Sequence, residues 1–327
     1  MYRSPGCADM RWWLVLLLAP LAGCVTHVPA DAGYRGPASL PAELVAAFDA
    51  KLGPVVVAEE ETLKERPSFS VLQVVLGTPD DAEPPVEFEY YDVRVDAPTP
   101  VVVLLPIFNG QLLITRYFAR YFANQGWRAV VVTRERDPLE QLDGLEDAIH
   151  ANLEDYRRVL DWVEQQHEID PTRIGLFGIS LGAMDAVMLT ALDPRVDALV
   201  AAMAGGDLAE IMMSTSYRRI ARTVERLLDH GGMSREGLRE TMEDSIVTDP
   251  LTLAPYVDAQ RVLLVLTRSD AIVPFESQEA LRESMGAPET LYLPTGHRPS
   301  VVYFPLLRSS AFEFFERQFR AEFIATG

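Results

Sequence analysis

Apolar and polar positions along this chain follow two different spacings. Short apolar runs rich in Val, Leu and Ile have the length of buried strands, and longer segments between them carry apolar residues every three or four positions. The apolar runs occupy residues 101–105, 128–133, 173–177, 196–203, 260–267 and 289–293. The helical spacing is found at residues 115–125, 145–166 and 183–192. Strands that alternate with helices predict an α/β fold, with a mostly parallel central sheet covered by helices on both faces.

The chain before this alternation has a different pattern. Residues 68–76 and 86–96 alternate in polarity or are rich in β-forming residues, which indicates opening antiparallel strands. The preceding segment is rich in Ala, Gly and Pro, with a short helix expected at 42–52. We therefore assign residues 24–67 to a tether and N-terminal extension, and residues 68–327 to one α/β domain.

Strands and helices stop alternating between residues 207 and 256. Two segments there, 209–230 and 234–245, have helical spacing. One stripe of the first segment is apolar and contains Ile220, Val224, Leu227 and Leu228. Such a stripe must be buried, either against the body of the protein or against a substrate, and the sequence leaves both alternatives open. Because the insertion lies between two predicted parallel strands, we expect it to cover one edge of the sheet.

Composition narrows the classes of partner. The chain has 48 acidic and 29 basic residues and a net charge of -19, which argues against nucleic acid as a partner. Its 327 residues and 48% hydrophobic content support one large domain with a substantial core. The sequence has no internal repeat, no phosphate-binding glycine loop and no paired-cysteine metal spacing. We therefore expect neither a metal ion nor a cofactor.

The first residues have the pattern of an export signal. Arg11 precedes an apolar run at 12–20 that is too short to span a membrane stably. The run ends in Leu-Ala-Gly-Cys at residues 21–24, which resembles the bacterial lipobox, where the cysteine is lipidated and becomes the mature N-terminus. The resemblance implies a lipoprotein signal peptide at residues 1–23 and lipidation of Cys24. We therefore expect a lipid-anchored protein of the bacterial cell envelope whose membrane contact is this anchor.

Neighbouring residues refine this expectation. Val25 stands where the inner-membrane retention signal usually has aspartate, so the resemblance favours the outer membrane, with the protein facing the periplasm. Met10 could serve as the start in place of Met1, because Arg11 already supplies a positive charge. The other cysteine, Cys7, lies in the segment to be removed, so we expect no disulfide framework.

The candidate chemistry begins at residues 178–182, Gly-Ile-Ser-Leu-Gly. This segment lies between the apolar run at 173–177 and the helical run at 183–192. A serine flanked by glycines at a strand-to-helix turn is a nucleophile elbow, in which the glycines let strand and helix approach and the serine Oγ is exposed above the sheet. A serine hydroxyl is a poor nucleophile until a base takes its proton, so Ser180 requires partners.

Suitable partners follow two later strands. Asp270 comes shortly after the run at 260–267, and His297 comes shortly after the run at 289–293. Both lie past the carboxyl end of a strand, where open α/β sheets place their sites. Histidine can take the proton of Ser180 near neutral pH and return it to a leaving group, and a carboxylate can fix the tautomer of the imidazole.

One other acid follows a predicted strand. Asp207 comes after the run at 196–203 and is an alternative partner for His297. Aspartate at the start of a predicted helix is also a common N-cap, because its oxygen accepts from the first free N–H groups. We favour the cap for Asp207 and the catalytic role for Asp270.

The order Ser180, Asp270, His297 is that of the α/β-hydrolase superfamily, which the chain resembles from residue 86 onward. Residues 169–182 and 270–274, together with Gly296 before the histidine, are similar to the dienelactone-hydrolase and prolyl-oligopeptidase-like branch. The resemblance implies the α/β-hydrolase fold, with the insertion at 207–256 as a helical cap. It also implies that Ser180 is the nucleophile, His297 the general base and acid, and Asp270 the residue that orients His297.

The oxyanion hole is expected to use two backbone N–H groups. One is that of Leu181, directly after the nucleophile. The second should follow the strand at 100–105, where the chain departs from the His-Gly of many relatives. Pro106 has no N–H to donate. We therefore choose Phe108, with Ile107 as the alternative.

These features favour a serine hydrolase that cleaves a small-molecule acyl ester through an acyl-enzyme intermediate, as a carboxylesterase does. A peptidase or thioesterase of the same fold is an alternative. No propeller domain precedes the hydrolase region, which argues against the full prolyl-oligopeptidase architecture. A catalytically inactive binding lipoprotein of the envelope is the alternative outside the enzymes, and the intact Ser180, Asp270 and His297 argue against it.

Overall fold

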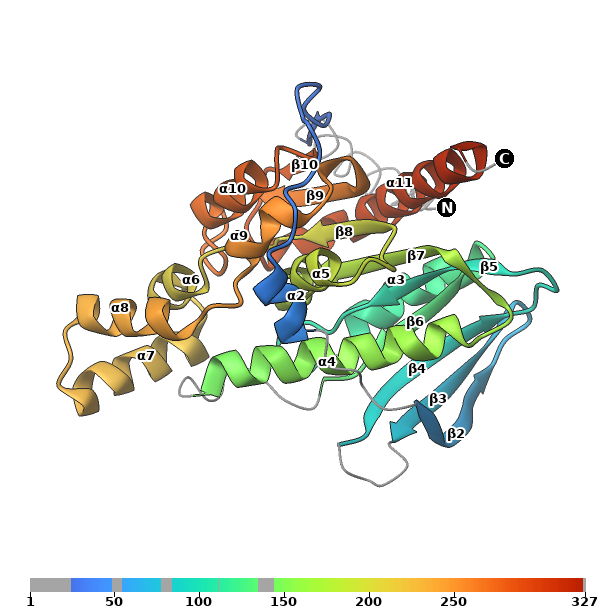
Figure 1. The fold of residues 1–327 in the computed structure, drawn as a ribbon, viewed down its shortest axis with the longest axis horizontal. Helices are drawn as coiled ribbons and strands as arrows, with labels where there is room; N and C mark the ends of the chain where they lie inside the picture. Colours follow the sequence, from blue (N-terminus) through green and yellow to red (C-terminus); the bar gives the residue numbers. More distant parts are fainter. Residues whose placement is uncertain (1–24, 49–54, 78–83, 111, 135–143, 326–327) are drawn as a thin grey trace, which may run out of the picture.

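A single mixed sheet organises the part of the chain that the structure describes. The computed structural model describes residues 25–48, 55–77, 84–110, 112–134 and 144–325, and in these ranges the strands form one ten-stranded sheet (Figure 1). The strands are β1 (Thr26–Val28), β2 (Val56–Glu65), β3 (Phe69–Gly77), β4 (Val86–Val93), β5 (Thr99–Leu104), β6 (Arg128–Val132), β7 (Ile169–Ile179), β8 (Ala198–Ala202), β9 (Val262–Thr267) and β10 (Glu289–Leu293).

The centre of the sheet is parallel and both of its ends are antiparallel. The spatial order is β1-β10-β9-β8-β7-β5-β6-β4-β3-β2. Pairing is parallel from β10 through β6 and antiparallel at β1 and between β6, β4, β3 and β2. The predicted parallel strands and the two opening antiparallel strands are therefore confirmed.

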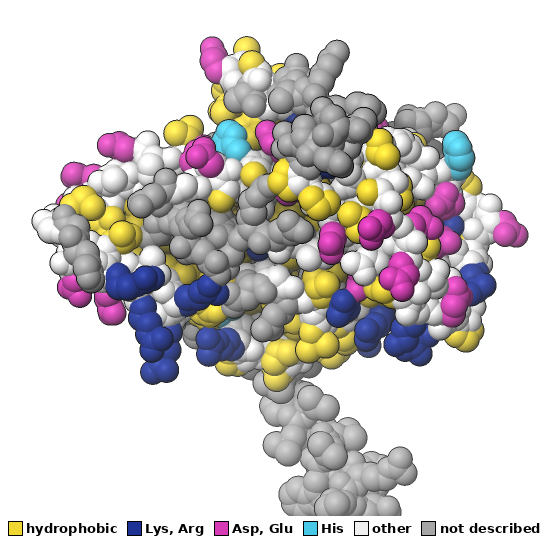
Figure 2. Space-filling model, turned by 90° about the horizontal axis from the view of Figure 1, so that it is seen from below, with side chains coloured by type: hydrophobic (Ala, Val, Ile, Leu, Met, Phe, Trp, Pro, Cys, Tyr) yellow, Lys and Arg dark blue, Asp and Glu magenta, His cyan; other side chains and the backbone are white. Residues whose placement is uncertain are grey.

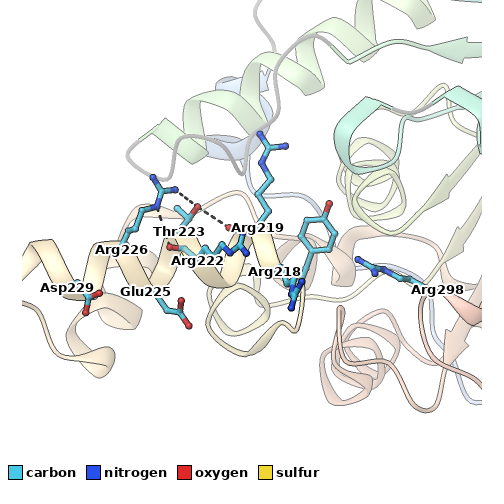
Figure 3. Close-up of a pocket in the computed structure, with 9 residues that line it drawn as sticks. Arg218, Arg219, Arg222, Thr223, Glu225, Arg226, Asp229 and Arg298 are labelled. Atoms are coloured by element: carbon cyan, nitrogen blue, oxygen red, sulfur yellow. Dashed lines mark hydrogen bonds between the residues drawn. The ribbon is translucent and has the colours of Figure 1, made fainter.

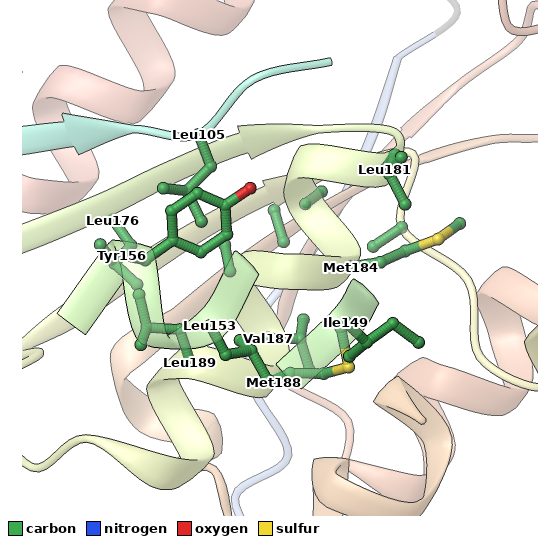
Figure 4. Close-up of a cluster of buried hydrophobic side chains, with 14 of the residues drawn as sticks. Leu105, Ile149, Leu153, Tyr156, Leu176, Leu181, Met184, Val187, Met188 and Leu189 are labelled. Atoms are coloured by element: carbon green, nitrogen blue, oxygen red, sulfur yellow. The ribbon is translucent and has the colours of Figure 1, made fainter. Parts of the chain in front are cut away.

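Helices cover both faces of the sheet, as the sequence predicted. Their bounds are α2 (Ala42–Phe48), α3 (Leu112–Asn124), α4 (Leu145–Glu164), α5 (Leu181–Leu192), α6 (Leu208–Ser214), α7 (Arg218–Gly231), α8 (Arg235–Ser245), α9 (Pro250–Leu253), α10 (Phe275–Ser284) and α11 (Phe304–Ala325). Successive strand residues point to opposite faces. In β5, Val102 and Leu104 pack in the cluster that contains the buried side chains of α3 and α11. Val101 and Val103 pack in the cluster with α4 and α5. Figure 4 shows part of this cluster, including Leu153 of α4 and Leu189 of α5.

The N-terminal extension contributes to the sheet, which differs from the tether expected there. In β1, Thr26 pairs with Tyr292 of β10, and β2 pairs antiparallel with β3. Three residues are too few to show a pattern, so β1 was not predicted. All of β2 is exposed and it is rich in glutamate, so it has no alternation to detect. Charged residues on such an edge strand hinder pairing with other chains.

The insertion forms separate helices rather than the single helix expected at 209–230. Figure 1 shows α7 and α8 extending beyond the end of the sheet. The break between α6 and α7 is held by the loop that carries Asp270. Thr215 Oγ1 donates to Ile272 O at 2.7 Å, and Ser216 N donates to Ala271 O at 2.7 Å. The cap is therefore fastened directly to the candidate acid loop.

No helix within the described residues is both long enough and apolar enough to cross a membrane. The predicted signal peptide at residues 1–23 and Cys24 lie outside the described residues.

Candidate active site

Ser180 occupies a strained turn between β7 and α5. Its φ of 57° and ψ of -125° place this non-glycine residue at positive φ, where a side chain is uncommon. Its N–H donates to Ala202 O of β8 at 2.8 Å, which holds the turn to the neighbouring strand. The sequence predicted this elbow, and the backbone has its expected strain.

The two flanking glycines permit a very close backbone approach. A Cβ added at Gly178 would lie 2.2 Å from the carbonyl oxygen of Gly182. A Cβ added at Gly182 would lie 2.7 Å from the carbonyl oxygens of Leu105 and Pro106. Side chains at these positions would push α5 away from β7 and from the segment after β5. The elbow geometry therefore requires both glycines.

Asp270 and His297 are brought together by parallel neighbouring strands. Asp270 follows β9 and His297 follows β10, and these strands end at the same edge of the sheet. His297 Nδ1 lies 2.8 Å from Asp270 Oδ2, within hydrogen-bond distance. Long-range pairing between residues 27 positions apart thus produces the contact that the sequence predicted.

The carboxylate of Asp270 is buried and held by several donors. Asp270 Oδ2 accepts from Thr267 Oγ1 at 2.6 Å and from Gln278 Nε2 at 3.2 Å. Asp270 Oδ1 accepts from Ile272 N at 2.9 Å. Burial raises the pKa of Asp270, but its hydrogen bond and electrostatic interaction with His297, together with the donors Thr267 and Ile272, bring the pKa below its ordinary value. Asp270 is therefore ionised near neutral pH, where it fixes the orientation of His297.

Ser180 and His297 line the same cavity, with a volume of about 450 Å³. Most of its wall is apolar and includes Met184, Met203 and Phe304 from the body of the protein. The cap contributes Leu208, Ile211, Met212 and Ile220 to the wall. Other apolar cap residues, including Val224, Leu238 and Met242, are buried in the main core cluster. The cap residues are thus packed into the core, and Leu208, Ile211, Met212 and Ile220 also face the cavity, while contact of the cap with a substrate stays a prediction.

Asp207 has the capping role that the sequence favoured. It is the N-cap of α6, and its Oδ1 accepts from Glu210 N at 2.9 Å. The N–H of Asp207 itself donates to Asp249 Oδ1 at 3.0 Å. Its carboxylate therefore stabilises the start of the cap.

The proposed oxyanion donors lie beside the elbow. Leu181 is the first residue of α5, so its N–H has no acceptor within the helix. Phe108 begins the 3₁₀ turn Phe108–Gly110, and both Phe108 and Leu181 line the cavity with Ser180. Because the carbonyls of residues 105 and 106 lie against Gly182, the segment that leads to Phe108 is adjacent to the start of α5.

A buried ion pair fixes the peptide that carries the Phe108 N–H. Arg134 Nη2 donates to Asp185 Oδ2 and to Tyr156 Oη, the latter at 3.1 Å, and Arg134 Nη1 donates to Ile107 O at 3.3 Å. The side chains of Arg134 and Asp185 are 2% and 3% exposed, so water screens this pair little. The Ile107 carbonyl and the Phe108 N–H belong to one trans peptide and point in opposite directions. Holding the oxygen therefore orients the N–H.

Sequence reasoning missed three residues of this site, namely Arg134, Asp185 and Gln278. Arg134 lies next to a strongly apolar strand and Asp185 within an apolar helix, which is a weak signal for a buried network, whereas Gln278 lies in a largely polar helix that gives no such signal. Among the described residues, no group of three or more His, Cys, Asp or Glu could hold a metal ion.

We expect Asp185→Ala to lower the free energy of unfolding by about 3–5 kcal/mol, because it leaves the buried Arg134 guanidinium without its carboxylate. The measurement is chemical denaturation of the purified protein. Glu316→Ala is the control, because it removes an exposed partner of Arg320 and should change stability by less than about 1 kcal/mol. Equal effects of the two substitutions would contradict a structural role for the buried pair.

Comparisons with solved structures identify relatives of this fold. Acetyl xylan esterase 1 from Thermoanaerobacterium sp. JW/SL YS485 aligns with a TM-score of 0.64 and 15% identity, over 86% of this chain and 95% of that chain. The acetyl xylan esterase from Paenibacillus sp. R4 aligns with a TM-score of 0.64 and 17% identity, over 84% and 92%. The acylaminoacyl peptidase from Pyrococcus horikoshii aligns with a TM-score of 0.56 and 15% identity, over 78% and 42%. At these identities the likeness shows the fold.

A comparison with curated protein sequences found no match. The family model described as "Alpha/beta hydrolase family" matches residues 135–313, which is more than half of the chain and includes Ser180, Asp270 and His297. This match, together with the elbow and the strand order, shows that the chain belongs to the alpha/beta hydrolase family.

Proposed function

We propose that this protein is a serine hydrolase that cleaves a carboxylic ester. Ser180 is the nucleophile, His297 the general base and acid, and Asp270 the residue that orients His297. The observation that carries the proposal is the 2.8 Å hydrogen bond between His297 and the buried Asp270. His297 also lines the same cavity as Ser180. If Asp270 only capped a loop and His297 were an ordinary loop histidine, the two side chains would not need to be bonded to each other beside Ser180.

The reaction follows from the roles of these groups. With Nδ1 held by Asp270, His297 Nε2 takes the proton of Ser180 as Oγ bonds to the ester carbonyl carbon. The N–H groups of Leu181 and Phe108 bind the oxyanion of the tetrahedral intermediate. The bond to the leaving oxygen then breaks, and His297 gives that oxygen the proton. Water attacks the acyl-enzyme by the same route, which releases the acid and restores Ser180.

The apolar wall favours an uncharged acyl group, because each buried methylene contributes about 0.8 kcal/mol. Two of the solved structures with a similar fold are acetyl xylan esterases, which favours an ester over an amide. The peptidase neighbour keeps amide or thioester hydrolysis as the alternative.

Ser180→Ala should abolish covalent labelling by a fluorophosphonate and lower the turnover of 4-nitrophenyl butyrate by several orders of magnitude, because no other group can form the acyl-enzyme. Gel fluorescence and the release of 4-nitrophenolate measure the two effects. Ser309→Ala, on α11, is the control that should retain both. Undiminished labelling of the Ser180→Ala protein would refute the assignment.

Asp270→Asn should lower kcat/KM by roughly 10⁴-fold, because an amide favours the wrong tautomer of the His297 imidazole. Asp207→Asn is the matched control and should change kcat/KM little, since asparagine caps a helix about as well as aspartate. Ester kinetics near neutral pH compare the two variants. A larger loss for the Asp207 variant would move the catalytic acid to the loop after β8.

We also propose that the protein is anchored to the envelope through a lipid on Cys24, facing the periplasm from the outer membrane. The Leu-Ala-Gly-Cys sequence at residues 21–24 supports this location. Cells grown with radiolabelled palmitate should label the wild-type protein and the Cys7→Ala control, but not Cys24→Ala, because only the mature N-terminal cysteine carries the lipid. Absence of label from the wild-type protein would exclude the anchor.

A further inference from the structure

A second cavity opens beside the apolar one, and arginines dominate its wall (Figure 3). It measures about 820 Å³. Five arginines line it, four from α7 and one from the loop after β10: Arg218, Arg219, Arg222, Arg226 and Arg298. Two acidic residues, Glu225 and Asp229, also line it. Figure 2 shows basic side chains grouped at the end of the molecule where α7 lies.

The positions of these arginines lower the stability of α7, the helix that carries four of them. Arg218, Arg222 and Arg226 follow one another at intervals of four residues, a spacing at which like charges repel, while Glu225 and Asp229 stand three residues after Arg222 and Arg226 and offset part of this repulsion. Arg218 and Arg219 also open α7, where the helix dipole favours negative charge. A bound anion would relieve both effects.

The arginine cavity adjoins the candidate active site. Tyr217 and Arg298 line both cavities, and Arg298 directly follows His297. The ring of Phe108 packs edge-on against the ring of Tyr217, with centroids 4.9 Å apart. Arg219 and Arg298 each lie with Cζ 5.9 Å from one of these rings, over Phe108 and Tyr217 respectively. The two aromatic rings thus form the boundary between an apolar cavity and a basic one.

The position of His297 identifies which part of an ester faces the arginines. His297 must give its proton to the leaving oxygen, so the alcohol part of the substrate lies on the His297 side of the site. Arg298 occupies that side. The acyl part can then occupy the apolar cavity and contact Met184, Met212 and Ile220 in its wall.

We propose that the arginine cavity binds an anionic group, a carboxylate or a phosphate, on the alcohol part of the substrate. Guanidinium groups bind either anion through paired N–H donors. The substrate class is therefore an amphiphilic ester, with an uncharged acyl chain and an anionic leaving alcohol. This inference rests on the proposed ester hydrolase function and names its substrate class.

The test compares three chromogenic esters on the full-length protein. 4-Nitrophenyl butyrate is neutral, 3-carboxy-4-nitrophenyl butyrate carries the anion on the alcohol part, and mono-4-nitrophenyl succinate carries it on the acyl part. Wild-type protein should give the highest kcat/KM for the alcohol-side anion. Its preference over the neutral ester should fall as salt is raised, because ions screen the arginines.

The double variant Arg218→Gln/Arg222→Gln should reduce the ratio of kcat/KM for 3-carboxy-4-nitrophenyl butyrate to that for 4-nitrophenyl butyrate by about tenfold. The control double variant Arg317→Gln/Arg320→Gln removes the same charge from exposed positions of α11 and should leave the ratio unchanged. Because both kcat/KM values are measured on the same protein preparation, a general loss of active enzyme does not change their ratio.

The outcomes separate this inference from the proposed function. An unchanged ratio in the α7 double variant, with normal turnover of the neutral ester, would overturn the anion site and leave the hydrolase standing. A preference for the succinate ester would also overturn it, because the anion would then lie on the acyl side. Failure of wild-type protein to hydrolyse any of the three esters would overturn the hydrolase function, and the anion site with it.

Discussion

The close approach of α5 to the ends of β5 and β7 is the constraint on which the site depends. Gly178 and Gly182 have no Cβ, and their backbone neighbours occupy the space that a Cβ would need. This approach exposes Ser180 at the turn and brings the segment after β5 against the first turn of α5. One backbone contact therefore positions both the proposed nucleophile and the two candidate oxyanion donors, which come from segments more than 70 residues apart in sequence.

The strain at Ser180 persists because the surroundings hold the turn from several sides. The N–H of Ser180 is bonded to β8, and α5 behind it is buried along almost its whole length. Asp185, one turn further along α5, pairs with Arg134, which in turn holds the Ile107 carbonyl. The same buried pair thus links the nucleophile helix to the loop that carries Phe108. We infer that the oxyanion geometry is set before substrate arrives, as electrostatic catalysis requires.

The sequence predicted the parts of the site that have local signals. The glycines around Ser180 and the apolar strands before Asp270 and His297 can each be recognised within about ten residues, and the fold then brings them together. The sequence could not predict β1, because its pairing with β10 depends on residues more than 260 positions away. The partners Arg134, Gln278 and Tyr156 depend in the same way on tertiary packing. The break between α6 and α7 was missed because its cause, the bonds from Thr215 and Ser216 to the Asp270 loop, is also non-local.

The charge of the whole molecule limits how the arginine cavity can act. A net charge of -19 repels anions at long range, but ions in solution screen this repulsion beyond about 8 Å at physiological ionic strength. Inside that distance an anion meets the five arginines of the wall, with Glu225 and Asp229 as the opposing acidic residues. The cavity therefore cannot steer distant substrates toward the enzyme. It can only favour an anion that has already reached the mouth of the site, so its effect lies in how tightly the anionic ester is held there rather than in long-range steering.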